Sequence, residues 1–335
     1  MVDYKRIDPH VHFRGTPLQS YKETIIHGLQ LAHSVGIGKV IGVTNLPEPY
    51  TVFDQKTAEA YLAEVPTEER DNFFIYMSLK HDRNQVAQAV WCYNNMPLIG
   101  GIKLFAGPST GDLGIIDPND QQDIFRWVVE EKYDGPLPTH CEEDALIQKG
   151  VNGKQFFNPD DPISHCRARP KECEIESARR IISLAIDSGF RGTLHIMHAS
   201  VPDTVDLVSE AKRNRNAKCR FTVGATPHHL IYDEGRMRWD DWYNYKMNPP
   251  LRSAQDVQDL GDRVGKMEVD WIETDHSPHS VGEKMYGYEK CPSGHPSLLI
   301  YPRCVDELLP SLGLSPEQIK TMTRDNILDV FEKLQ

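Results

Sequence analysis

The sequence lacks several features that would place it in common classes of protein. No apolar run reaches 18 residues, the length that a membrane-spanning helix needs. The seven cysteines are odd in number and include no C-x-x-C pair, which argues against a disulfide framework or a cysteine zinc site. Positive charge is scarce, since 37 Lys and Arg stand against 49 Asp and Glu, for a net charge of −12. This balance argues against nucleic acid or an anionic membrane as the main partner.

The N-terminal segment MVDYKRIDPHVHF is charged and has no apolar signal core, so we expect a cytoplasmic protein with reduced thiols. The chain has 335 residues, of which 39% are hydrophobic and 26% charged, enough for one large core. It contains no low-complexity segment and no linker rich in Gly and Ser. We therefore expect residues 1–335 to form a single domain.

Short β-branched runs alternate with amphipathic stretches along the chain. The strand candidates are residues 6–12, 39–44, 73–78, 101–105, 137–140, 193–198, 220–224 and 269–274. The helix candidates are residues 20–34, 55–62, 85–94, 120–131, 171–188 and 202–213, with closing helices at 297–309 and 315–334. Eight such units predict an α/β protein, a (β/α)8 barrel of the TIM type without a separate N-terminal β domain. A doubly wound sheet is the alternative, but its glycine-rich loop after the first strand is missing.

Residues that can bind a metal or carry a proton occur at the ends of the predicted strands. In chain order they are His10, His12, Lys103, His140, His198 and Asp275. The C-terminal ends of barrel strands form one rim, where the catalytic groups of such barrels lie. Side chains two apart on a strand face the same way, so His10 and His12 can hold one ion. The pattern predicts a metal site at this rim.

Each of these residues also has a structural interpretation. Buried histidines often bond to backbone, Lys103 could extend to solvent from a strand end, and Asp275 could cap a helix. The neighbours of Lys103 are apolar, however, and burial lowers the pKa of a lysine. A neutral amine can take up carbon dioxide to form a carbamate, which is an anionic ligand with two oxygens. His195 faces away from His198 on the predicted strand, so we interpret His195 as structural.

Eight segments in order resemble the dihydroorotase family, in the cyclic amidase branch of the amidohydrolase superfamily. They are DPHVHFR (8–14), GVTNLPEP (42–49), GIKLFAG (101–107), THCEE (139–143), HIMHAS (195–200), TPHHL (226–230), NPPLR (248–252) and TDHSPH (274–279). One such motif is modest evidence, whereas eight in the family's order are highly specific.

The resemblance implies two Zn²⁺ ions per chain. His10, His12, Asp275 and an N6-carboxylated Lys103 would hold one ion, and Lys103, His140 and His198 the other. A hydroxide bridging the ions would attack a ring amide, with Asp275 as general base and then acid. The implied reaction is the reversible interconversion of N-carbamoyl-L-aspartate and L-dihydroorotate, the third step of de novo pyrimidine biosynthesis.

The resemblance also implies that Arg14, Asn45 and His279 bind the substrate, whose exocyclic carboxylate suits a guanidinium fork. A surface salt bridge is the alternative for Arg14, and an Asx turn is the alternative for Asn45. In one departure, Gly224 stands where many longer dihydroorotases have a glutamate. Residues 107–111 and 282–294 are candidate loops over the mouth, or ordinary connections.

Other functions remain open at this point. A dihydropyrimidinase or allantoinase-like amidase would share the metal motifs but not Arg14, Asn45 and His279, the residues implied to bind the substrate. A non-catalytic barrel subunit of a transcarbamoylase complex is a different class, but such homologues typically lose metal ligands that this sequence keeps. The partner we expect is a small-molecule substrate, with no nucleic acid and no membrane. Family habit implies a homodimer, and association with aspartate transcarbamoylase stays open.

Overall fold

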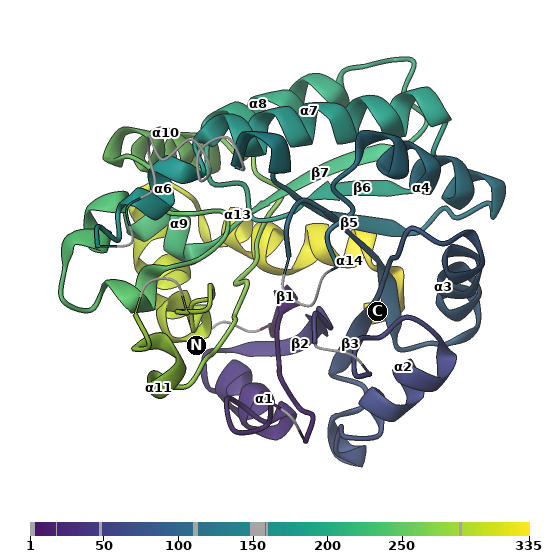
Figure 1. Ribbon diagram of the computed structural model, residues 1–335, viewed down its shortest axis with the longest axis horizontal. Helices are drawn as coiled ribbons and strands as arrows, with labels where there is room; N and C mark the ends of the chain where they lie inside the picture. Colours follow the sequence, from purple (N-terminus) through teal and green to yellow (C-terminus); the bar gives the residue numbers. More distant parts are fainter. Residues whose placement is uncertain are drawn as a thin grey trace.

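The computed structural model describes residues 4–17, 19–46, 49–109, 113–147, 158, 160–287 and 290–335. Eight parallel strands follow one another in chain order around a barrel (Figure 1). The strands are β1 Arg6–Val11, β2 Ile37–Gly42, β3 Phe73–Ser78, β4 Ile99–Ala106, β5 Pro136–Cys141, β6 Thr193–Ile196, β7 Arg220–Ala225 and β8 Trp271–Ile272. The barrel predicted from the alternating pattern is confirmed.

Apolar residues dominate most of the strands, and the polar ones among them, such as Asp8 and Lys103, are buried as well. Every residue of β1, β3, β4 and β5 is buried, as expected for a parallel sheet covered by helices outside and packed side chains inside. Contacts between β1 and the segment after β8 complete the ring. Val11 forms a bridge with His276, and the backbone N–H of His12 donates to the His276 carbonyl at 2.7 Å.

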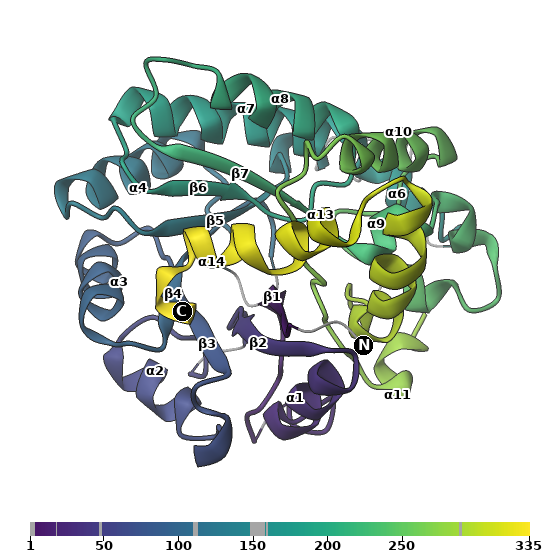
Figure 2. The same ribbon diagram turned by 180° about the vertical axis from the view of Figure 1, so that it is seen from behind.

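Helices surround the strands (Figures 1 and 2). They are α1 Ile25–Ser34, α2 Gln55–Leu62, α3 Arg83–Asn95, α4 Pro118–Glu130, α6 Ser164–Ala168, α7 Lys171–Ser188, α8 Pro202–Lys212, α9 Pro227–Ile231, α10 Ala254–Gly265 and α11 Val281–Lys284. Side-chain caps set several starts, and the Thr24 cap makes α1 begin at Ile25, five residues after the predicted start at residue 20. The sequence reading missed α10, which separates β7 from β8.

The C-terminal segment covers the N-terminal ends of the strands and is less regular than the two helices predicted there (Figure 2). It comprises a 3-10 turn Ser297–Ile300, π-helices Arg303–Leu308 and Thr321–Asp325, α12 Leu309–Ser311, α13 Pro316–Lys320 and α14 Asn326–Val330. Ion pairs of Asp306 with Arg6 and of Asp329 with Arg220 attach it to the starts of β1 and β7. In the described part of the chain, no helix is long and apolar enough to cross a membrane.

Candidate active site

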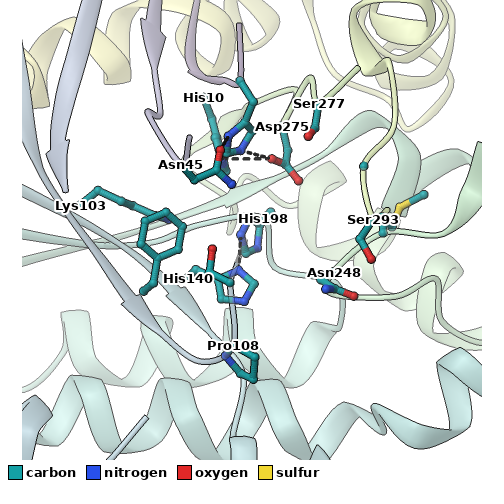
Figure 3. Close-up of a pocket in the computed structure, with 15 residues that line it drawn as sticks. His10, Asn45, Lys103, Pro108, His140, His198, Asn248, Asp275, Ser277 and Ser293 are labelled. Atoms are coloured by element: carbon teal, nitrogen blue, oxygen red, sulfur yellow. Dashed lines mark hydrogen bonds and ion pairs between the residues drawn. The ribbon is translucent and has the colours of Figure 1, made fainter. Parts of the chain in front are cut away.

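A polar cavity opens at the C-terminal ends of the strands (Figure 3). All six residues that the sequence marked as metal-competent line it, and so does Asn45. The other lining residues are Phe105, Pro108, Ser109, Met247, Asn248, Ser277, Ser293 and Gly294. Pro108 and Ser109 come from the first candidate loop, and Ser293 and Gly294 from the second. Residues 110–112 and 288–289 of these segments lie outside the described residues.

His10, His12 and Asp275 form the first group of converging side chains. The Nε2 atoms of the two histidines are 3.1 Å apart, and Asp275 Oδ1 lies 3.1 Å from His10 Nε2 and 2.8 Å from His12 Nε2. Burial lowers the pKa of His12 to about 4, so its ring is neutral. Its Nδ1 lies 2.8 Å from the amide oxygen of Asn45, which can only accept. His12 Nδ1 therefore donates, and its Nε2 presents a lone pair to the cavity.

His140 and His198 form the second group, across the cavity from the first (Figure 3). His140 Nδ1 and His198 Nε2 are 3.0 Å apart. Burial and the neighbouring His140 lower the pKa of His198 well below its ordinary value. The outer nitrogen of His140 lies 3.3 Å from the buried carboxylate of Glu142, which in turn pairs with Arg169 at 2.6 Å. The His198 ring is therefore neutral, and the two rings face each other through nitrogen atoms.

Lys103 reaches the cavity from the middle of β4 and is 1% exposed. Its Nζ contacts the sulfur of Met197 and lies 4.9 Å from the centre of the Phe105 ring. Burial lowers the pKa of this amine to about 7, so a large fraction is neutral at physiological pH. The amine therefore has the environment that carbamate formation requires.

The donor set fits a bound metal. One ligand atom from each of His10, His12 and Asp275 can be chosen so that all lie within 4.8 Å of one another. Ring nitrogens also meet in pairs inside the cavity, His10 Nε2 with His12 Nε2 at 3.1 Å and His140 Nδ1 with His198 Nε2 at 3.0 Å, as ligand atoms around a cation would. Burial alone would raise the pKa of Asp275, but the surrounding histidines lower it well below its usual range. A carboxylate and imidazoles, of which those of His12 and His198 are neutral, are ligands that zinc accepts.

The backbone at two of these residues is strained. His198 has a φ of 40° and Asp275 a φ of 50°, values that residues other than glycine rarely adopt. Both residues lie beyond their strands, because β6 ends at Ile196 and β8 at Ile272. The predicted strands 193–198 and 269–274 are therefore too long. Such conformations persist only where the surroundings hold them, and they cluster at functional sites.

The residues predicted to bind substrate are only partly at the cavity. Asn45 lines it, whereas Arg14 and His279 lie beside each other next to the lining residue Ser277. Arg14 is 3% exposed and donates to Ser277 Oγ at 2.6 Å and to the carbonyl of Pro278 at 3.3 Å. It forms no ion pair within the described residues, so the alternative of a surface salt bridge is wrong.

His195 lies outside the cavity, between Thr222 Oγ1 at 3.0 Å and Glu273 Oε2 at 2.9 Å. The structural interpretation of this histidine agrees with that placement. Sequence reasoning missed Glu273 itself, a carboxylate within the strand candidate 269–274. It assigned no role to Asn248, the first residue of the motif at 248–252, or to Ser293 in the candidate loop 282–294, although both line the cavity.

Comparisons with known proteins agree with the motifs. A dihydroorotase from Latilactobacillus sakei is 31% identical over 308 residues, which cover 88% of this chain and 64% of that protein. A dihydroorotase from Halobacterium salinarum is 28% identical over 344 residues, which cover 97% of this chain and 71% of that protein. This chain thus spans slightly less than two thirds of the first relative. No family model matches the chain.

The fold is also found among solved structures. L-hydantoinase (dihydropyrimidinase) from Arthrobacter aurescens superimposes with a TM-score of 0.79 at 20% identity, covering 98% of this chain and 70% of that one. At this identity the match shows a shared barrel fold. The chain is therefore a sequence relative of dihydroorotases with the fold of a hydantoinase.

Proposed function

We propose that this relative of the dihydroorotases is a zinc-dependent cyclic amidohydrolase that interconverts N-carbamoyl-L-aspartate and L-dihydroorotate. The observation that carries the proposal is the convergence of four histidines, one lysine and one aspartate on a single buried cavity. Catalysis of this reaction would place the chain at the third step of pyrimidine biosynthesis.

Two zinc ions would be held by the two groups of side chains, with Lys103 between them. His10, His12 and Asp275 would bind one ion, and His140 and His198 the other. The neutral amine of Lys103 would add to carbon dioxide, losing one proton, to give a carbamate, an anionic group that could serve as a further metal ligand. When bound, the ions supply an activated water at neutral pH and polarise the substrate carbonyl.

Asp275 would act as the proton carrier. Its Oδ1 lies 3.1 Å from His10 Nε2 and 2.8 Å from His12 Nε2, at the point where the ion would bind, and a carboxylate there can accept a proton from the attacking water. It would then deliver this proton to the ring nitrogen as the C–N bond breaks. In the cyclisation direction the same carboxylate would take the proton from the nitrogen of N-carbamoyl-aspartate.

The substrate carboxylate would bind on the side of Arg14, Asn45 and His279. A buried guanidinium that has no carboxylate partner among the described residues favours an anionic ligand, because an unpaired buried charge is costly. Burial and the adjacent Arg14 lower the pKa of His279 to about 2, so the histidine is neutral and can accept from Arg14 or donate to the ligand. Dihydrouracil lacks this carboxylate, as does hydantoin.

The test is an assay of both reaction directions on protein whose zinc content is measured in the same sample. We expect about two zinc ions per chain and a preference for dihydroorotate over dihydrouracil of about 10²-fold or more, the cost of leaving a buried charge unpaired. Equal rates on the two substrates would overturn the assignment in favour of a dihydropyrimidinase. Protein that binds no zinc and shows neither activity would overturn it altogether.

A further inference from the structure

Glu273 is a fully buried carboxylate that lies directly behind the cavity without lining it. Its Oε1 accepts the backbone N–H of His198 at 2.5 Å, and its Oε2 accepts the indole N–H of Trp271 at 3.0 Å. His195 Nε2 lies 2.9 Å from Oε2, and His10 Nδ1 lies 3.5 Å from Oε1. One side chain therefore contacts residues of β1, β6 and β8.

Two of these partners fix the chemical form of the group. The backbone N–H of His198 and the indole N–H of Trp271 can only donate, and they face different oxygens of the carboxylate. A glutamine would place its NH₂ against one of these two donors in either orientation. Only a group that accepts through both oxygens satisfies the pair, so an isosteric amide is not equivalent here.

These contacts act on two side chains of the cavity. The carboxylate opposite His10 Nδ1 favours the tautomer in which that nitrogen carries the proton, which leaves the Nε2 lone pair towards His12 and Asp275. The bond to the His198 backbone holds the residue whose φ is 40°. Release of that bond would free the strained turn that points His198 at His140.

The neighbouring strand leaves the room that this side chain occupies. A Cβ atom built on Gly224 would lie 2.6 Å from Glu273 Cδ and 2.8 and 2.9 Å from its two oxygens. Any side chain at position 224 would therefore collide with the carboxylate. In a glutamate, Cβ and Cδ are about 2.5 Å apart, as two single bonds at a tetrahedral angle require. A glutamate at position 224 can thus bring its own carboxylate to the same point.

We propose that Glu273 is a positioning residue that orients His10 and His198 for metal binding, and that Gly224 is the space this carboxylate needs. A carboxylate at position 224 or at position 273 can carry this function, but the two positions cannot both hold one. The inference rests on the proposed function in one respect, that the histidines of the cavity are zinc ligands.

The test compares Zn²⁺ affinity, measured by chelator competition, in the whole chain and four variants. We expect Glu273→Gln to weaken binding about 10- to 100-fold, the usual range for a group that supports a metal ligand. Gly224→Ala should weaken it in the same direction, because the methyl group displaces the carboxylate. The exchange variant Gly224→Glu with Glu273→Ala should recover most of the lost affinity.

The matched control is Glu174→Gln. Glu174 is equally buried and accepts bonds from Ser200 and Thr204, but it does not line the cavity, so Zn²⁺ affinity should stay within about threefold. The visible spectrum of bound Co²⁺, which reports ligand geometry, should change in Glu273→Gln and return in the exchange variant. If Glu273→Gln does not fold, Gly224→Ala and the exchange variant carry the test.

Wild-type Zn²⁺ affinity and Co²⁺ spectrum in both Glu273→Gln and Gly224→Ala would overturn the inference while leaving the proposed function intact. An exchange variant that binds Zn²⁺ no better than Glu273→Gln would also overturn it. Absence of zinc binding by the wild-type chain would instead overturn the proposed function.

Discussion

At the N-terminal end of the barrel the ionisable side chains are paired with one another, whereas at the C-terminal end several are not. Arg6 with Asp306, Arg220 with Asp329 and Lys212 with Asp270 form direct ion pairs at 2.5–2.8 Å. Around the cavity, by contrast, the Lys103 amine contacts a methionine sulfur, and the ring nitrogens of His140 and His198 face each other at 3.0 Å. One end of the barrel is built for stability, and the other keeps polar groups available for a ligand at a cost in stability.

The largest expected effect comes from replacing Lys103 with methionine. Cyclic amidase activity should fall by about 10³-fold or more, since several kcal/mol of transition-state stabilisation depend on the metal pair. The metal-free protein should become more stable by about 1–2 kcal/mol, because an apolar side chain replaces a buried amine. Denaturant unfolding in the presence of a chelator measures the second effect. A destabilised metal-free variant would contradict the contrast between the two ends.

Arg14→Ala tests the buried cation beside the cavity. We expect kcat/KM for dihydroorotate to fall about 10²- to 10³-fold, because truncation removes a charge-assisted contact with the substrate carboxylate. Zinc content should stay at two ions per chain. Ser277→Ala is the matched control, since it removes only the hydroxyl that Arg14 contacts and should cost less. An equal loss of activity on dihydrouracil would show that Arg14 supports the fold rather than the substrate.

The sequence predicted those features of the fold that a local pattern of residues determines. The period of apolar runs located all eight strands, and the rule that barrel strands end at one rim brought together His10, Lys103, His140 and Asp275. The alternation of side chains along a strand was a less reliable guide to side-chain direction, because His198 and Asp275 lie beyond the strand ends and have positive φ. Their direction depends on contacts such as Glu273 with the His198 backbone, which join residues far apart in the sequence and leave no local signal.

The irregular C-terminal segment shows the same limit. Two continuous helices were predicted, but the first begins as a 3-10 turn and continues as the π-helix Arg303–Leu308, and the second contains a π-helical turn at Thr321–Asp325. The C-terminal segments pack against the N-terminal ends of β1, β7 and β8. Their shape is therefore set by tertiary packing rather than by helix propensity.

His165 offers a test of a buried histidine that has a partner. Its Nε2 bonds to the Met247 carbonyl at 2.9 Å, and burial lowers its pKa to about 3 from 6.5. Below pH 6.5 the unfolded chain takes up a proton that the folded chain does not, so the free energy of unfolding should fall by about 1.4 kcal/mol per pH unit. His165→Gln should remove about 2 kcal/mol of this loss between pH 6.5 and 4.5 in denaturant unfolding. If the unfolding free energy of the variant fell between pH 6.5 and 4.5 as much as that of the wild type, the result would contradict a buried, neutral His165.

The smallest effect should come from Asp306→Asn at the paired end of the barrel. Asp306 bonds to Arg6, but its side chain is 54% exposed, so solvent screening limits the loss of unfolding free energy to about 1 kcal/mol or less. Activity and zinc content should not change, because this pair lies at the end of the strands opposite the cavity. The same substitution at Asp275 should cost about 10²- to 10⁴-fold in activity, as expected for the loss of a general base. If Asp306→Asn lowered activity as much as Asp275→Asn, the two ends of the barrel would not be separable in function.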